Sequence, residues 1–156
     1  MTLATDGFLK AGLVGNIGLN LPPDPPEEGR SRHKYGNGPF AKLRMPLLPN
    51  EPGVYLWQED DKIVYIGQTT RPLKVRLGTG EYSTISRYNT YARQLGRRNG
   101  GQETNCRINA LANISLISGR TLVIWYKVTS PEIAKPEEAT WIRIHGLPSW
   151  NRRDER

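Results

Sequence analysis

The sequence predicts an α/β fold in which a small central antiparallel sheet of three strands is flanked by helices. Two apolar runs, Val54–Trp57 and Ile63–Ile66, are rich in β-branched and aromatic residues, and the acidic stretch Glu59-Asp60-Asp61 separates them. This pattern is typical of a β-hairpin, with strands expected near residues 53–58 and 62–67. A third apolar run, "TLVIWYKV", spans Thr121 to Val128 and predicts a buried strand.

Length and composition favour one intracellular domain. A chain of 156 residues can bury a single large core without covalent staples. Cys106 is the only cysteine, so no intrachain disulfide can form, and two histidines, His33 and His145, give little support for a histidine-based metal site. The N-terminal segment has neither the basic start of a signal peptide nor a membrane-spanning run. We therefore expect a soluble, cytoplasmic protein without a membrane partner.

Residues 1–51 are predicted to form an N-terminal arm and linker. The stretch "NLPPDPPEEGRSRHKYGNGPF", residues 20–40, is too rich in proline and glycine for a regular helix or a central strand. Before it, a short helix over Asp6–Val14 is possible, with Asp6 as its N-cap. Residues 52–156 then form the main predicted domain.

Four helical patterns follow the hairpin. Thr69 or Thr70 can cap a helix that begins over Leu73–Leu77, with a proline in its first turn, and Gly78 and Gly80 interrupt it. The stretches "TISRYNTYARQLGRRNGG" and "NCRINALANISLISG" predict a second, basic helix and a third helix.

The last predicted helix lies in "KPEEATWIRIHGLPSWNRR". Pro136 is expected at its start, Glu137 and Glu138 in its first turn, and Gly146 at its end.

Positive charge is concentrated after the hairpin. The chain has a net charge of +7, and residues 71–98 hold seven basic residues against one acidic residue, Glu81. Tyrosines lie among these bases, which suits contacts with phosphates and with sugars or bases. A solvated helical face is the alternative interpretation. The basic segment 78–106 is predicted to be a helical insertion, and the candidate DNA-binding residues are Arg71, Lys74, Arg87, Tyr88, Arg93, Arg97 and Arg98.

Four separated motifs in this order resemble the GIY-YIG nuclease family over roughly residues 52–152. Gly53-Val54-Tyr55 matches the first motif with valine in place of isoleucine, and Tyr65-Ile66-Gly67 matches the second. Arg76 in "PLKVRL" stands where the family has its helix arginine. Glu138 begins "EATWIRIHGLPSWN", which is similar to the family's terminal helix with its metal-binding glutamate and its closing asparagine, here Asn151.

The resemblance implies hydrolysis of DNA phosphodiester bonds, with Tyr55, Tyr65, Arg76, Glu138 and Asn151 as catalytic residues. Hydrolysis needs a base near a water molecule and positive charge against the phosphate. Only about one tyrosine in a thousand is ionised at neutral pH unless nearby cations lower its pKa. Arg76 can hold a phosphate oxygen, and Glu138 is the expected ligand of Mg²⁺, for which Mn²⁺ should substitute.

Each assignment has a structural alternative. The two tyrosines are ten residues apart, and this spacing alone does not fix the face of the hairpin on which each lies. In the alternative interpretation, the two tyrosines are ordinary half-buried strand residues, Arg76 is a basic residue on the surface of its helix, and Glu138 complements the helix dipole. Many relatives carry a histidine or tyrosine one turn after the arginine, where this chain has Gly80, and Tyr82 is a candidate replacement.

The compact chain is most like the restriction endonucleases of the family. It has no room for the separate DNA-binding domain of homing enzymes or the added parts of repair subunits, so the nuclease must read DNA with its own insertions. The expected substrate is double-stranded DNA, cut site-specifically, and a homodimer on a palindromic site is an assembly that this subclass implies. The alternatives are an inactive nucleic-acid-binding module, a nuclease of DNA repair or mobile-element origin, and a structural or protein-interaction domain.

Overall fold

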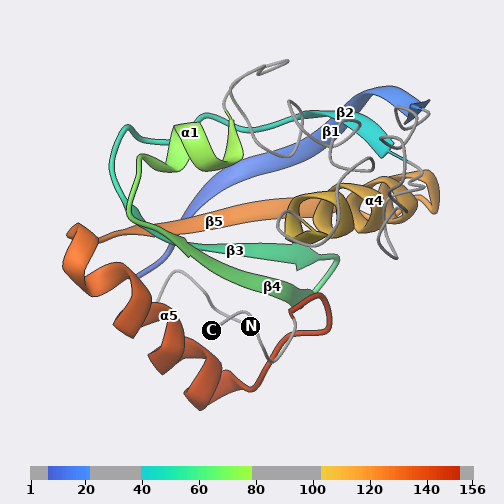
Figure 1. Ribbon diagram of the computed structural model, residues 1–156. Coiled ribbons are helices and arrows are strands. Elements are labelled where there is room, and N and C mark those ends of the chain that lie inside the picture. The colour runs from blue at the N-terminus through green and yellow to red at the C-terminus, as the bar shows by residue number, and fades with distance from the viewer. Residues whose placement is uncertain (1–6, 22–39, 79–102, 152–156) are drawn as a thin grey trace, which may run out of the picture.

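The computed structural model describes residues 7–21, 40–78 and 103–151, which form an antiparallel sheet with helices on both faces (Figure 1). The predicted α/β class is confirmed, but the expectation of three strands was wrong, because the sheet has five. Their order across the sheet is β2-β1-β5-β3-β4. The strands are β1 Leu9–Leu21, β2 Phe40–Arg44, β3 Gly53–Glu59, β4 Lys62–Thr69 and β5 Leu122–Val128.

Strand β3 is paired along its whole length on both sides. It runs antiparallel to β4 from Gly53 to Glu59 and antiparallel to β5 over the same residues. Its first five residues are buried, as expected for a strand that has neighbours on both edges and helices on both faces. The predicted hairpin and the predicted strand at 121–128 are therefore confirmed, and β3 is the strand that joins them.

The helix predicted over Asp6–Val14 was wrong, because Leu9–Leu21 forms β1. Its first half pairs with β5 and its second half with β2. The spacing of the apolar residues resembles a helical pattern, but Gly12, Gly15 and Gly18 weaken a helix. The open edge of β5 offers hydrogen bonds to this backbone, so tertiary pairing decides its structure.

The edge strand β2 is fastened to helix α4, Glu103–Ile117, by an asparagine. The amide of Asn109 accepts a hydrogen bond from the Ala41 N–H at 2.9 Å and donates one to the Ala41 carbonyl, also at 2.9 Å. Asn109 is fully buried. Its side chain thus takes the place of a neighbouring strand at this edge of the sheet.

Two apolar clusters lie on the two faces of the sheet. One contains Tyr55, Trp57 and Tyr65 and is covered by α4 and by the short helix α1, Leu73–Leu77. The other contains Leu56 and Ile66 and is covered by α5. In Figure 1, α1 and α5 accordingly lie on opposite sides of the sheet. We call these the tyrosine face and the α5 face.

Helix α5 spans Pro131–His145, so the prediction that it begins at Pro136 was wrong. Ser130 is at the N-cap position and Pro131 begins the helix, where its missing N–H costs nothing. Pro136 lies inside the helix, and Glu132, not Glu137 or Glu138, is the acid in the first turn. The predicted end is confirmed, because Gly146 has a positive φ of 86° and its N–H bonds to the Ile142 carbonyl.

The predicted helices at residues 73–77 and 105–119 are confirmed as α1 and α4. The predicted basic helix in residues 84–101 and most of the linker at 20–40 lie outside the described residues. None of the helices within the described ranges combines the length and the apolar character that crossing a bilayer needs.

An ion pair joins α5 to the sheet and should make stability depend on pH. Lys127 Nζ lies 2.6 Å from Glu137 Oε1, and Trp141 Nε1 donates to the same oxygen at 3.2 Å. The hydrogen bond from Lys127 is the main cause that holds the pKa of Glu137 below its ordinary value of 4.5, while partial burial opposes it. A carboxylate with a lowered pKa stabilises the fold above its unfolded pKa, and this stabilisation is lost as the pH falls through the folded pKa.

We therefore expect Glu137→Gln to lower the free energy of unfolding near neutral pH, and this difference from the wild type should shrink as the solution is acidified. Urea unfolding at a series of pH values measures it. Asp61→Asn, in the exposed hairpin turn, is the control and should leave the free energy of unfolding near neutral pH unchanged. A Glu137→Gln deficit that stays constant into acid would contradict the prediction.

Candidate functional site

The hairpin of β3 and β4 contains a β-bulge at Val64. Next to the turn, Gln58 pairs with Ile63, but the following pair is Trp57 with Tyr65. Val64 is therefore an extra residue on β4 that has no partner on β3. The bulge shifts the register of the rest of β4 by one residue.

This shift decides the face on which Tyr65 lies. In a ladder without the bulge, Tyr65 would stand opposite Leu56, whose side chain belongs to the α5 face. With the bulge it stands opposite Trp57, which points to the same side as Tyr55 two residues earlier. The rings of Tyr55 and Tyr65 are stacked, with centroids 6.2 Å apart and planes 29° apart.

Glycines are required at two positions around Tyr55. Gly67 stands directly opposite Tyr55, and a Cβ atom there would lie 2.5 Å from Tyr55 Oη and 2.6 Å from its Cε2. The ring thus occupies the space that a side chain at Gly67 would take. A Cβ on Gly53 would collide with the Lys127 carbonyl group and lie 3.1 Å from Val128 Cα. Both glycines allow close packing beside Tyr55.

The C-terminal segment closes the outer edge of β4 beside the tyrosines. The Trp150 N–H donates to the carbonyl of Val64 at 2.8 Å. The amide of Asn151 accepts from the Ile66 N–H at 2.9 Å and donates to the Ile66 carbonyl at 2.8 Å. The buried Arg107 of α4 donates from Nε to the Trp150 carbonyl at 3.2 Å. Asn151 therefore holds the backbone between Tyr65 and Gly67.

Helix α1 places Arg76 over the tyrosine face. Leu73 and Leu77 are fully buried in the cluster that contains both tyrosines, and Arg76 is half-buried beside Leu77. Of the predicted DNA-binding residues near this helix, Arg71 is exposed and Lys74 is half-buried. Arg71, Lys74 and Arg76 thus bring basic side chains to this end of the sheet from α1 and from the turn before it.

Glu138 lies on the side of α5 that faces the sheet. It is half-buried and falls four residues after Ala134 and four before Ile142, both of which are buried. Glu137, the neighbouring acid, is engaged with Lys127. The two neighbouring glutamates therefore have different surroundings, although nothing in their sequence spacing separates them. Both glutamates stand on α5, which covers the α5 face, so the described structure does not bring Glu138 together with Tyr55, Tyr65 and Arg76 on one face.

The described part of the chain offers few clustered side chains that could bind a metal ion. Within residues 7–21, 40–78 and 103–151, no three side chains of histidine, cysteine, aspartate or glutamate gather as a metal cluster. A magnesium ion at Glu138 would take its other ligands from water and substrate phosphate, which is a common arrangement for this ion. Glu138, a half-buried residue, would supply the one protein carboxylate in that arrangement, and binding of a metal stays a prediction.

Tyr126 is a further tyrosine of this face that the sequence analysis did not select. It stands directly opposite Tyr55 on β5 and is half-buried against the same cluster. The signal in the sequence was its place in "VIWYKV", but only the register between β3 and β5 shows which of these aromatic residues lies beside Tyr55.

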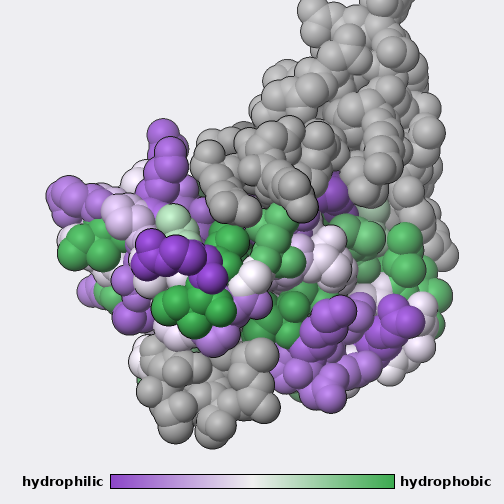
Figure 2. All heavy atoms as spheres, turned by 90° about the horizontal axis from the view of Figure 1, so that it is seen from below, coloured by the Kyte–Doolittle hydropathy of each residue, from purple (hydrophilic) through white to green (hydrophobic). Residues whose placement is uncertain are grey.

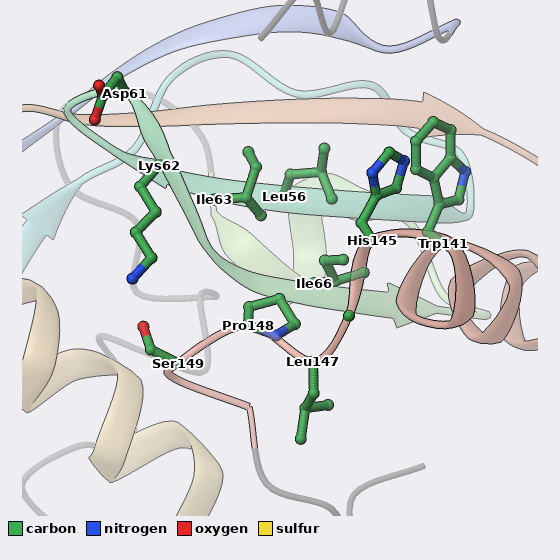
Figure 3. Close-up of a pocket in the computed structure, with 11 residues that line it drawn as sticks. Leu56, Asp61, Lys62, Ile63, Ile66, Trp141, His145, Leu147, Pro148 and Ser149 are labelled. Atoms are coloured by element: carbon green, nitrogen blue, oxygen red, sulfur yellow. The ribbon is translucent and has the colours of Figure 1, made fainter.

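A cavity of about 610 Å³ lies on the opposite, α5 face. Figure 3 shows Leu56, Ile63 and Ile66 at its base, with Trp141 and His145 from α5 and Leu147 from the loop after it along the sides. His145, the last residue of α5, stacks on Trp141 with centroids 4.8 Å apart. Seen from this side, apolar side chains reach the surface between hydrophilic ones (Figure 2). The cavity and the paired tyrosines are thus on different faces.

Several predicted DNA contacts cannot be placed. The residues Arg87, Tyr88, Arg93, Arg97 and Arg98, and also Tyr82, lie outside the described residues. Their assignment stays a prediction from the sequence.

Comparison with solved structures shows a likeness of fold. The chain is similar in structure to a mutant of bacteriophage T4 EndoII. The two share a TM-score of 0.53 and 18% sequence identity, and the match covers 96% of each chain. No family model and no curated protein matches the sequence. The likeness to EndoII therefore concerns the fold, and it extends over almost the whole length of both proteins.

Replacement of Gly67 should disturb the tyrosine pair. Gly67→Ala would place a methyl group where the ring of Tyr55 lies, so we expect the free energy of unfolding to fall by about 1–3 kcal/mol in urea unfolding. Gly15→Ala is the matched control, because a Cβ there meets Arg44 Cβ at an ordinary 3.7 Å. Equal stability of the two variants would show that Tyr55 does not need the space above Gly67.

The two asparagine clamps should be separable by hydrogen exchange. Asn151→Ala and Asn109→Ala each remove two hydrogen bonds to an edge strand, at a cost of roughly 1–3 kcal/mol. Exchange of the Ile66 amide should accelerate in Asn151→Ala, and exchange of the Ala41 amide in Asn109→Ala. If neither variant raises exchange selectively at its own partner, the asparagines do not act as local clamps.

Proposed function

We propose that this protein is a metal-dependent endonuclease that hydrolyses phosphodiester bonds of double-stranded DNA. The observation that carries the proposal is the stacked pair of Tyr55 and Tyr65, brought to one face by the Val64 bulge, with Arg76 in the helix packed over that face. The fold shared with EndoII, a phage nuclease, supports the same class of activity. Within this class, we propose that the protein is a site-specific restriction endonuclease of the GIY-YIG family. The proposal includes a homodimer that acts on a palindromic site.

In the proposed mechanism, Tyr55 acts as general base in its phenolate form and takes a proton from the water that attacks phosphorus, while the bond between phosphorus and the leaving oxygen breaks. Tyr65, stacked beside it, orients Tyr55 and the water through its hydroxyl group. Arg76 supplies a permanent positive charge and a planar donor pair for the scissile phosphate, whose negative charge grows in the transition state. Asn151 contributes by holding the backbone of Ile66, and so sets the position of Tyr65 relative to Tyr55.

Glu138 is the proposed ligand of Mg²⁺ or Mn²⁺. When bound, the metal ion would stabilise charge on the phosphate and the leaving oxygen. Glu138 is half-buried on α5, the helix that covers the face opposite the paired tyrosines, and its assignment rests on the family motif, whereas the carboxylate of Glu137 is already paired with Lys127. This contrast supports the choice of acid made from the family motif.

A plasmid assay tests the proposed class. Purified protein is incubated with supercoiled plasmid in Mg²⁺, in Mn²⁺ and in EDTA, and the products are separated as nicked, linear and supercoiled DNA. A site-specific restriction enzyme gives a fixed set of fragments. Products that do not form such a set would favour a nuclease of repair or mobile-element origin. DNA binding without cutting under any of these conditions would instead identify an inactive binding module.

The pair of neighbouring glutamates gives the sharpest test of the site. We expect Glu138→Gln to lower the cleavage rate by at least about 10²-fold, because it removes the proposed metal ligand, and to leave DNA binding intact or tighter. Glu137→Gln is the control and should keep its cleavage rate while losing stability. Inactive Glu137→Gln together with active Glu138→Gln would show that the wrong acid has been assigned.

A further inference from the structure

The register of the sheet puts a third tyrosine beside the proposed catalytic pair. Tyr126 of β5 and Tyr55 of β3 are directly opposite each other in an antiparallel ladder. Such residues point to the same face, with Cβ atoms about 5 Å apart. Tyr126 accordingly packs against the cluster that contains Tyr55 and Tyr65.

The ring of Tyr55 lies over β4, on the side of β3 that is away from β5. Its end atoms occupy the space above Gly67, and it stacks on Tyr65, which also belongs to β4. Tyr126, Tyr55 and Tyr65 therefore stand on three neighbouring strands, β5, β3 and β4, and belong to one face of the sheet.

The three side chains differ in their access to solvent. Tyr55 is 1% exposed and Tyr65 is 5% exposed, whereas Tyr126 is only half-buried. Among the described residues, no hydrogen bond is recorded for the Tyr126 hydroxyl, while both other tyrosines have further interactions. A partly exposed tyrosine with an available hydroxyl, next to a buried tyrosine pair, is placed to meet a ligand rather than to complete the core.

We propose that the Tyr126 hydroxyl donates a hydrogen bond to a phosphate oxygen of the DNA backbone beside the proposed scissile bond. The inference rests on the proposed function. The hydroxyl of tyrosine is a hydrogen-bond donor, and phosphate oxygens take a large share of protein–DNA hydrogen bonds, including those from tyrosine. Tyr126 would fix the position of the backbone from the β5 side, while Arg76 acts from α1. It is a substrate-binding residue in this scheme, and Tyr55 remains the base.

The test measures binding and cleavage separately. Tyr126→Phe is made in the wild type, for cleavage, and in the Glu138→Gln background, for binding. The dissociation constants of Glu138→Gln and of the double variant for a short DNA duplex are measured over a range of salt concentrations. We expect affinity to fall about tenfold, as for the loss of one hydrogen bond to a charged group. The slope of log affinity against log salt should not change, because the hydroxyl is neutral and releases no counterion.

Trp125→Phe is the matched control. Trp125 is the neighbouring residue on β5 and points to the α5 face, where its Nε1 donates to Gln58 Oε1 at 2.7 Å. This variant also loses a polar atom from an aromatic ring, but it should leave DNA affinity unchanged. Thermal unfolding should show Tyr126→Phe to be as stable as the wild type, since no recorded hydrogen bond is lost.

The outcomes separate this inference from the proposed function. If the wild type cuts DNA and Tyr126→Phe binds and cuts as well as its parent, the hydroxyl does not contact the substrate and only this inference fails. A fall in affinity with a changed salt slope, or an equal fall in Trp125→Phe, would also overturn it, because the effect would then be indirect. If the wild type cuts no DNA with either metal, the proposed function fails and this inference fails with it.

Discussion

The bulge at Val64 is the feature on which the candidate site depends. The hairpin turn pairs Glu59 with Lys62, and a regular ladder from that turn would send Tyr55 and Tyr65 to opposite faces of the sheet. One extra residue reverses this outcome and stacks the two rings. A bulge disrupts the local ladder, so it persists only where the surrounding structure stabilises it. The rest of the fold can be understood as supplying that support.

Support for the bulge comes from the far end of the chain. The carbonyl of the bulged residue is taken by the Trp150 N–H, and the backbone of Ile66 by the amide of Asn151. Arg107, buried in α4, holds Trp150 in turn. These contacts satisfy the open edge of β4, as Asn109 does for β2 at the other edge. The same side chains that protect the sheet from further pairing thus hold Tyr65 in place.

Local signals in the sequence predicted the hairpin, β5, α1 and α4, but they did not predict β1, β2 or the way in which the elements meet. The hairpin, β5 and α4 follow from periodicity, and the end of α5 follows from Gly146, whose conformation favours glycine. The strand β1 was missed because its glycines and apolar residues resemble a weak helix, and only the free edge of β5 makes it a strand. The paired residues of β1 and β5 are far apart in the sequence, from Val14 with Leu122 to Leu9 with Tyr126, and pairing over such a separation leaves no trace in a local pattern.

The same limit applies to the single residues of the candidate site: local motifs identify them, but they do not show which of them meet. The motifs named Tyr55, Tyr65, Arg76 and Glu138, but the spacing of ten residues between the tyrosines could not place them on one face without knowledge of the bulge. Tyr126 belongs to no motif, and only its register opposite Tyr55 brings it to the tyrosine face. Since β3 joins β4 to β5, it is the one strand that can align residues from both neighbours. A motif confined to the hairpin therefore describes only half of the surface that β3 organises.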